Sequence, residues 1–184
     1  KAVTETGLVA ADGSEHEVDT IVFATGFHVT DMPIGQKVRG RGGVLLDDVW
    51  RGSPQAYLGA TVAGFPNMFT LIGPNTGLGH SSMVYMIESQ IRYVLDALRV
   101  MDERGLTSVE VRQDVQDAYN AELQAKMPKT VWMSGCASWY IDANGRNTTI
   151  WPDFTFRFRK RTARFDVEHY EVSTKVPEPV PAAA

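Results

Sequence analysis

The stretch "IVFATGFHVTDMP", residues 21–33, begins with the residues of a buried strand and continues with small side chains. The β-branched and aromatic run at its start favours a strand. This run gives way to Ala24, Thr25 and Gly26. In open α/β sheets, ligands bind beyond the carboxyl ends of the strands, and a glycine there lets the backbone come close to them. The stretch therefore predicts a core strand whose end leaves space for something other than a side chain.

A second apolar stretch, "NMFTLIG" at residues 67–73, has the same form. It predicts another short strand, and the loop "GPNTGLGH" at residues 73–80 follows it directly. Two such strand ends in one chain suggest a single flat cofactor at one edge of an α/β sheet. Small residues and glycine-proline turns also occur at strand ends for packing alone, so a purely structural interpretation stays open.

A long amphipathic helix is predicted after this loop. Apolar side chains recur there at helical spacing, and they are Met83, Ile87, Ile91, Val94, Leu95 and Leu98. We expect the helix to begin between Gly79 and Ser82 and to end near Gly105. Its first turn would present free N–H groups and about half a positive charge, which favours an anion or a carbonyl that accumulates charge. A reduced flavin is one ligand of that kind, and this arrangement would raise its electron affinity.

The other predicted elements are short. A hairpin is expected at the start, with strands in residues 1–10 and 15–25 joined through Asp12-Gly13. Residues 31–59 are rich in glycine and predict a long excursion with extended pieces such as "GGVLLDD". The segments after the long helix are a strand at 106–111, a helix at 114–127 closed by Pro128, a hairpin turn at Asn144-Gly145, a strand at 154–159 with buried phenylalanines, and a disordered proline-rich tail.

Composition argues against several classes of protein. The net charge of -4 and the pI of about 5.6 argue against a nucleic-acid-binding protein. Cys136 is the single cysteine, so an internal disulfide or a cysteine zinc cluster cannot form, and a reducing cytoplasm is expected. No stretch reaches the roughly 18 apolar residues of a membrane span, and no signal-peptide pattern occurs at the start. Because Lys1 is not Met and a hairpin is already under way there, we expect a piece of a longer chain.

Several reactive or charged residues have ordinary structural explanations beside functional ones. His80 could contact a flavin or a substrate, but it could equally cap a helix or be exposed. Cys136 is expected to be a small buried hydrophobe. The other histidines lack metal-ligand spacing, so no metal site is predicted. The basic residues between positions 157 and 164 could contact a cofactor phosphate, although a solvated face paired with acids is the more common explanation.

Three long motifs resemble the carboxyl-terminal part of flavin-containing monooxygenases of the Baeyer-Villiger and N-oxide-forming type. They are "DTIVFATGF", "FPNMFTLIGPNTGLGHSSMVYMIESQI" and "SWYIDANGRNTTIWPDFTFRFRKRT", and the match reaches to about Tyr170. The resemblance implies an α/β chain with a partial glutathione-reductase-like FAD/NAD(P)-binding fold. Residues 1–20 would end the NADPH domain, residues 21–170 would form the C-terminal part of the FAD-binding domain, and residues 171–184 would be a flexible tail.

The resemblance also implies roles for particular residues. Those that would contact the cofactors are Ala24, Thr25, Gly26, Gly73, Pro74, Asn75, Thr76, Gly77, Leu78, Gly79 and Trp139. Trp139 would approach the nicotinamide cofactor, NADP, whereas the others would contact FAD. Leu78, His80 and Met83 would lie on the substrate side of the flavin ring. Enzymes of this family reduce FAD with NADPH and insert one atom of O2 into a ketone, an amine or a sulfide, so a small organic substrate is implied.

Parts of the family's pattern are missing from the chain. No GxGxxG segment occurs, so neither phosphate-binding glycine loop of FAD or NADPH is present. We therefore expect that the polypeptide alone is inactive, that its partner is the missing N-terminal part of the same enzyme, and that exposed apolar surface favours self-association. Neither nucleic acid nor membrane is an expected partner. Two alternatives stay open: a pyridine-nucleotide disulfide reductase-like flavoprotein, and a non-catalytic remnant that binds a protein partner.

Overall fold

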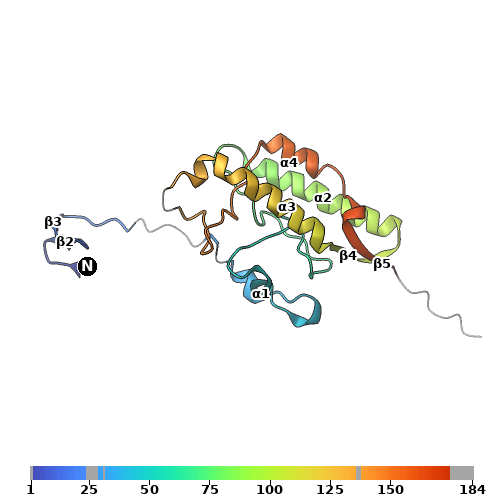
Figure 1. The fold of residues 1–184 in the computed structure, drawn as a ribbon, viewed down its shortest axis with the longest axis horizontal. Helices are drawn as coiled ribbons and strands as arrows, with labels where there is room; N and C mark the ends of the chain where they lie inside the picture. The colour runs from blue at the N-terminus through green and yellow to red at the C-terminus, as the bar shows by residue number, and fades with distance from the viewer. Residues whose placement is uncertain (1, 24–28, 31, 136–137, 175–184) are drawn as a thin grey trace, which may run out of the picture.

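The computed structural model describes residues 2–23, 29–30, 32–135 and 138–174, and Figure 1 shows how their elements are arranged. This part of the chain combines helices with two small antiparallel sheets, so the prediction of a mixed α/β chain is confirmed. Ala24, Thr25 and Gly26, which were predicted to end the first core strand, lie outside the described residues. Cys136 and the predicted tail beyond Thr174 also lie outside them.

The first sheet is a small one near the N-terminus. Its order is β1-β2-β3, with β1 at Ala2–Val3, β2 at Gly7–Val9 and β3 at Glu15–Glu17. The predicted turn at Asp12-Gly13 is confirmed, because Gly13 has a φ of 92° and Asp12 Oδ1 accepts a hydrogen bond from the Ser14 N–H. The sheet has one strand more than predicted, since the chain reverses between β1 and β2.

The strand predicted at residues 21–23 is not formed. β3 ends at Glu17, and the side chains of Val22 and Phe23 are 80% and 79% exposed. An apolar strand is stable only where neighbours pair with its backbone and cover its faces. None of the strands in the described part of the chain pairs with this segment. The strand prediction is therefore wrong at this position.

Three helices and a two-stranded sheet form the main body of the protein. Helix α2 spans Met83–Glu103, α3 spans Gln113–Lys126 and α4 spans Thr155–Arg161. Strand β4, Leu106–Val111, pairs antiparallel with β5, Tyr170–Thr174. In Figure 1 the three helices lie together, with β4 and β5 at one end of them.

The remaining elements are short helices in the connections. They are η1 (Pro33–Gln36), η2 (Arg41–Gly43), α1 (Leu46–Trp50), η3 (Met127–Lys129), η4 (Val131–Met133) and η5 (Val167–His169). Of the helices in the described residues, none has both the length and the apolar character needed to cross a bilayer.

The predictions that rest on long periodic patterns are confirmed. Helices α2 and α3 and strand β4 lie close to their expected bounds. Helix α2 ends before Gly105, which has a φ of 61°, and α3 ends before Pro128. Residues 171–174, which were predicted to belong to the flexible tail, form part of β5 instead.

Three predictions of extended structure are wrong. Residues 67–73 form turns and irregular backbone, and residues 42–48 contribute instead to η2 and α1. Residues 154–159 enter α4, and of their three phenylalanines only Phe158 is buried. Short apolar runs do not distinguish strands from helices or turns, because packing against distant elements decides between them.

Two apolar clusters form the core. The larger one joins α2, α3, α4 and the β4-β5 sheet, and its fully buried side chains include Tyr93, Leu123, Trp151 and Phe158. Burying one such large apolar side chain contributes about 1.5–3 kcal/mol. The smaller cluster surrounds α1 and consists of Leu46, Trp50, Ala56, Val62 and Phe65. Leu78, one of the predicted site residues, packs against the larger cluster.

Helix α2 buries a different face from the one that the sequence pattern indicates. Its buried residues are Met86, Ser89, Gln90, Tyr93, Ala97 and Val100. Leu95 and Leu98, two of the residues whose spacing predicted the amphipathic helix, are 61% and 50% exposed. The helix is apolar on two sides, so the spacing alone could not identify the side that packs within this chain.

Candidate functional site

The loop at residues 73–80 leads from irregular backbone into α2. Its first half lies inside the protein, where Pro74, Asn75 and Thr76 are buried. The middle of the loop is half-buried, and only Gly79 and His80 at its end are exposed. A ligand outside this chain could therefore reach the end of the loop and not its first half.

The glycines of this loop pack closely against other parts of the chain. A Cβ atom would overlap the Gly59 carbonyl at Gly73, the Thr149 carbonyl at Gly77 and the Trp132 ring at Gly79. Packing within the chain is thus sufficient to require glycine at all three positions. This agrees with the alternative that the small residues of the loop serve packing alone. Contact between the exposed end of the loop and a cofactor stays a prediction.

Backbone hydrogen bonds join the loop to a segment far along the chain. The N–H of Gly77 donates to the Thr149 carbonyl at 2.8 Å, and the N–H of Trp151 donates to the Gly77 carbonyl at 2.8 Å. These two bonds form an isolated parallel bridge between Gly77 and Ile150. The structure therefore brings together two of the motifs that resemble the monooxygenases.

The start of α2 is open to a ligand. Residues 79–82 are exposed, and the Ser82 side chain makes no capping hydrogen bond within the described part of the chain. The first turn of the helix also contains no acidic side chain. An uncapped helix start of this kind favours an anion or a carbonyl that gains negative charge. The residues present thus fit the pyrimidine edge of a reduced flavin.

A cavity of about 310 Å³ lies beside the end of the loop. Its lining residues are His80, Thr130, Val131, Trp132, Trp151, Pro152, Asp153 and Phe154. Of the three predicted substrate contacts, His80 lines this cavity, whereas Leu78 packs against the main core and Met83 is half-buried at the start of α2. The structure does not bring the three together around this cavity.

Trp132 and Phe154 are residues of this cavity that sequence reasoning missed. Phe154 was assigned to the buried face of a strand, and the aromatic residues of 131–140 offered no periodic pattern. In the structure Trp132 meets Tyr140 edge to face at 5.5 Å, and Tyr140 stacks on Trp139 at 4.7 Å. Trp139, a predicted cofactor contact, is 49% exposed. These three rings therefore connect Trp139 to the loop end at Gly79.

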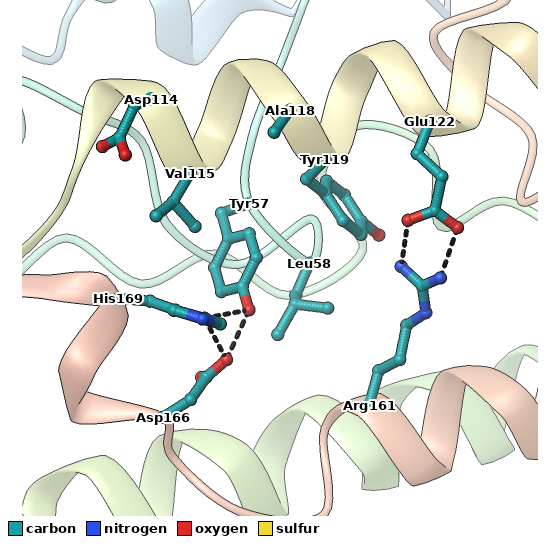
Figure 2. A pocket seen from close by; sticks show the side chains of 10 residues that line it. All are labelled: Tyr57, Leu58, Asp114, Val115, Ala118, Tyr119, Glu122, Arg161, Asp166 and His169. Carbon is teal, nitrogen blue, oxygen red and sulfur yellow. Dashed lines mark hydrogen bonds and ion pairs between the residues drawn. The ribbon is translucent and has the colours of Figure 1, made fainter.

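A larger cavity, about 520 Å³, lies between α3, α4 and η5, and none of the predicted site residues lines it. Figure 2 shows the Asp166 carboxylate meeting the Tyr57 hydroxyl and the His169 ring at one end, and Arg161 meeting Glu122 at the other. His169 Nδ1 lies 2.8 Å from the Tyr57 hydroxyl and 2.5 Å from Asp166. Burial, followed by the hydrogen bond to Asp166, raises the pKa of Tyr57. The polar groups at each end bind one another, which indicates a structural role.

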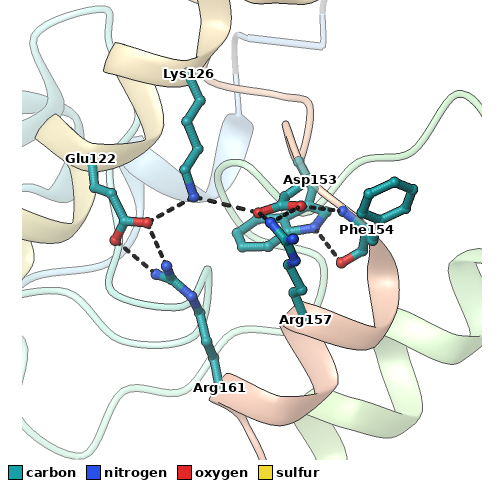
Figure 3. A network of polar contacts seen from close by, with 7 residues as sticks. Glu122, Lys126, Asp153, Phe154, Arg157 and Arg161 are labelled. Atoms are coloured by element: carbon teal, nitrogen blue, oxygen red, sulfur yellow. Dashed lines mark hydrogen bonds and ion pairs between the residues drawn. The ribbon is translucent and has the colours of Figure 1, made fainter.

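Three of the four basic residues of α4 are paired with acids, as the more common explanation predicts, and they are Arg157, Arg159 and Arg161. Figure 3 shows Arg161 on Glu122, and Arg157 and Lys126 on Asp153. Lys126 Nζ also lies 2.8 Å from Glu122. Hydrogen bonds from Arg161, together with Lys126, lower the pKa of Glu122 to about 2 against the effect of partial burial. In the described residues, no group of three or more His, Cys, Asp and Glu side chains is placed to hold a metal ion.

Known proteins resemble the chain over nearly its whole length. No protein-family model matches it. A Baeyer-Villiger monooxygenase of Pseudomonas aeruginosa is 54% identical over 176 residues, which are 95% of this chain and 33% of the relative. Another, from Streptomyces coelicolor, is 51% identical over 179 residues. The matched residues are 96% of this chain and 34% of the relative. Over nearly its whole length the chain is similar to Baeyer-Villiger monooxygenases. It spans about a third of the length of these curated relatives.

Solved structures show the same similarity to monooxygenases. A cyclohexanone monooxygenase from Rhodococcus sp. Phi1, bound to NADP+, matches with a TM-score of 0.72 at 28% identity, over 94% of this chain and 34% of that one. The OTEMO complex with FAD and NADP matches with a TM-score of 0.70 at 29% identity, over 93% of this chain and 33% of that one. The resemblance found in the sequence motifs is confirmed.

Proposed function

We propose that the chain is the C-terminal part of an FAD- and NADPH-dependent monooxygenase that inserts one oxygen atom of O2 into a ketone. The observation that carries the proposal is the exposed, uncapped start of α2 behind the loop at residues 73–80. Similarity to Baeyer-Villiger monooxygenases and to a solved structure in complex with FAD and NADP supports it. Relatives named Baeyer-Villiger and cyclohexanone monooxygenase favour a ketone over an amine or a sulfide.

Each part of the chain has a distinct task in this proposal. The N–H groups at the start of α2 would hold the pyrimidine edge of the flavin, and Gly79 would let the backbone come close to it. His80, Trp132 and Phe154 form a wall of the substrate cavity. Bound FAD, reduced by NADPH, would supply the reaction with O2. The protein's contribution is to orient the ring, hold the substrate beside it and exclude water.

Six further predicted contacts belong to the same proposal. Trp139, exposed at the end of its ring series, would meet the nicotinamide cofactor. Leu78 and Met83 would contact the substrate side of the flavin. Ala24, Thr25 and Gly26 would adjoin FAD where the chain re-enters a glutathione-reductase-like FAD domain. The phosphate-binding GxGxxG loops would be supplied by the N-terminal part of the same enzyme, which we expect in the cytoplasm because of the single cysteine.

The experiment compares two forms of the protein. One is the 184-residue chain, and the other is the protein as its gene encodes it. We expect the 184-residue chain to purify colourless, and the encoded protein to carry FAD and to oxidise NADPH faster when a cyclic ketone is added, with a lactone or ester as product. An encoded protein without flavin, or with NADPH oxidation that no ketone, amine or sulfide couples to oxygenation, would overturn the proposal.

A further inference from the structure

The buried half of the loop at residues 73–80 is fixed by the side chain of Asn75. This side chain is 1% exposed, and its Nδ2 donates to the carbonyl oxygens of Asn147 and Ile150, both at 2.9 Å. The Asn75 N–H donates to the Thr148 carbonyl at 2.7 Å. We call these three bonds the Asn75 clamp. It joins the loop to residues 147–150 immediately before the Gly77–Ile150 bridge.

The backbone of Asn75 adopts a conformation that few residues accept. Its φ is 56°, in the left-handed region that favours glycine, asparagine and aspartate. Glycine would accept this φ but could not donate to the two carbonyls. Aspartate would also accept it, but as a carboxylate it has no hydrogen to donate and would place an oxygen against two carbonyl oxygens. Asparagine therefore meets both requirements of this position.

A second buried amide holds the backbone on the other side of the loop. Gln90, from α2, is fully buried, and its Oε1 accepts from the Ile72 N–H at 2.8 Å. Its Nε2 donates to the carbonyls of Leu58 and Gly59 at 3.1 and 3.0 Å. The loop thus lies between two side-chain amides that bind backbone groups. Because backbone bonds set register as well as stability, this arrangement determines where the loop end is placed.

We propose that Asn75 is a positioning residue, whose clamp fixes the loop so that Gly79 and the start of α2 face the flavin at the correct distance. The inference rests on the proposed function, because it assigns the loop end to the flavin. Asn75 acts through the loop and touches neither cofactor nor substrate, since it is buried and the loop end is exposed. A residue with a merely structural role would change stability and leave the properties of the bound flavin unchanged.

Asn67 provides a matched control. It also has a positive φ, 58°, and its side chain also binds the backbone of a distant segment, with Nδ2 donating to the Thr107 carbonyl at 2.9 Å and Oδ1 accepting from the Val109 N–H at 3.0 Å. These partners belong to β4, outside the candidate site. The substitution Asn67→Ala therefore removes the same kind of contact without altering the clamp.

The test uses the protein as its gene encodes it, with the variants Asn75→Ala, Asn75→Gly and Asn67→Ala. We expect both Asn75 variants to weaken FAD binding about tenfold, which corresponds to the loss of one or two net hydrogen bonds, and to shift the visible absorption bands and the reduction potential of the bound flavin. Asn67→Ala should leave the FAD dissociation constant within about twofold of the parent value, because its contacts lie outside the site. The comparison is made between samples with the same fraction of folded protein. If the FAD dissociation constant, the absorption bands and the reduction potential are the same in all three variants, the proposal is overturned.

Amide hydrogen exchange separates this inference from the proposed function. In Asn75→Gly, which keeps the backbone conformation, the Gly77 and Trp151 amides should exchange at least about tenfold faster, because their bonds open with the clamp. Unchanged exchange at both amides would overturn the clamp whether or not the protein holds flavin. If exchange is faster in Asn75→Gly but the parent protein binds no FAD, the clamp is confirmed. The proposed function and the flavin-positioning role of Asn75 are then refuted.

Discussion

The indole of Trp132 lies against the α-carbon of Gly79, so that a methyl group on Gly79 would overlap the ring. Gly79 is the last glycine before α2, and Trp132 belongs to η4 after α3. The contact therefore joins the start of one helix to the segment that follows another. It also forms a corner of the cavity that His80 lines.

A methyl group at Gly79 tests this contact. We expect Gly79→Ala to cost about 1 kcal/mol in the free energy of unfolding, because the indole must move out of its packed position. In a Trp132→Ala background the same substitution should cost nothing measurable, since the overlapping ring is gone. Urea unfolding of the four proteins of this double-mutant cycle measures the coupling. Gly35→Ala is the control, because a Cβ there makes only ordinary contacts at 3.4 Å. Additive costs of the two substitutions would contradict the contact.

The ion pair between Glu122 and Arg161 should make stability depend on pH in the acid range. The pKa of Glu122 is lowered from 4.5 to about 2, so the folded state favours its charged form. The stabilisation is therefore present above about pH 4.5 and is lost as the pH falls toward 2. Glu122 is partly exposed, so solvent screening limits the effect to below about 1 kcal/mol.

Unfolding midpoints of the parent protein and of Glu122→Gln measure this effect. The difference between the two should be largest near neutral pH and should shrink below pH 4.5. Glu88→Gln is the control, because Glu88 lies 3.9 Å from a single arginine, Arg159. A difference between parent and Glu122→Gln that is constant across this pH range would refute the assignment.

Asp166 joins three side chains from distant elements. It accepts hydrogen bonds from the hydroxyls of Tyr57 and Tyr93 and pairs with His169. We expect Asp166→Ala to destabilise the protein by roughly 2–3 kcal/mol, since it leaves two mostly buried hydroxyls without their acceptor. The exposed Asp48 is the control, and Asp48→Ala should change the free energy of unfolding by less than about 0.5 kcal/mol.

The same network should delay tyrosine ionisation. Burial is the first cause that raises the pKa of Tyr57, Tyr93 and Tyr170 above 10. Stability from these neutral phenols is complete below pH 10 and is lost as the pH rises beyond that value. The tyrosinate absorbance of these three residues should therefore appear together with unfolding. Ionisation of all six tyrosines near pH 10 in the folded protein would contradict the buried network.

The exposed apolar face of α2 should promote association of the 184-residue chain. Val84, Ile91, Leu95 and Leu98 lie on it with exposures of 40–61%, and such patches are rare on monomers. Sedimentation velocity should show concentration-dependent dimers or larger species that Leu95→Lys diminishes. Gln113→Lys, which adds the same charge on exposed α3, should leave them unchanged. A chain that stays monomeric at high concentration, or equal effects of both lysines, would refute this role of α2.

The long elements and the resemblance to monooxygenases could be predicted from the sequence. The predictions failed where the same pattern fits more than one structure and packing decides between them. Helices α2 and α3 and strand β4 have periodic or β-branched sequences whose local preference agrees with the fold. Residues 154–159 alternate as a strand would, yet they form α4, because the buried contact of Phe158 with Trp151 is made from a helix. The face that α2 buries could not be identified from the sequence for a related reason, since apolar residues lie on both of its sides.

The candidate site was only partly predictable. The loop at residues 73–80 and its position before a helix could be identified, because glycine, proline and helix periodicity are local signals. The clamp made by Asn75 and the neighbouring position of Trp132 depend on residues more than fifty positions away, so no local pattern contains them. The role of Gln90 could not be predicted either. A glutamine in a helix is recognised as a buried amide only when the backbone groups that it binds are known.

The bridge between Gly77 and Ile150 closes a long circuit of the chain at one point. The two ends of the intervening segment are therefore held side by side by backbone hydrogen bonds. Insertions within this segment need not disturb those bonds. Crossover points for chimaeras between relatives are therefore best set at these two residues. Exchanging the enclosed stretch would transplant new cavity walls, provided that the donor keeps the glutamine equivalent to Gln90.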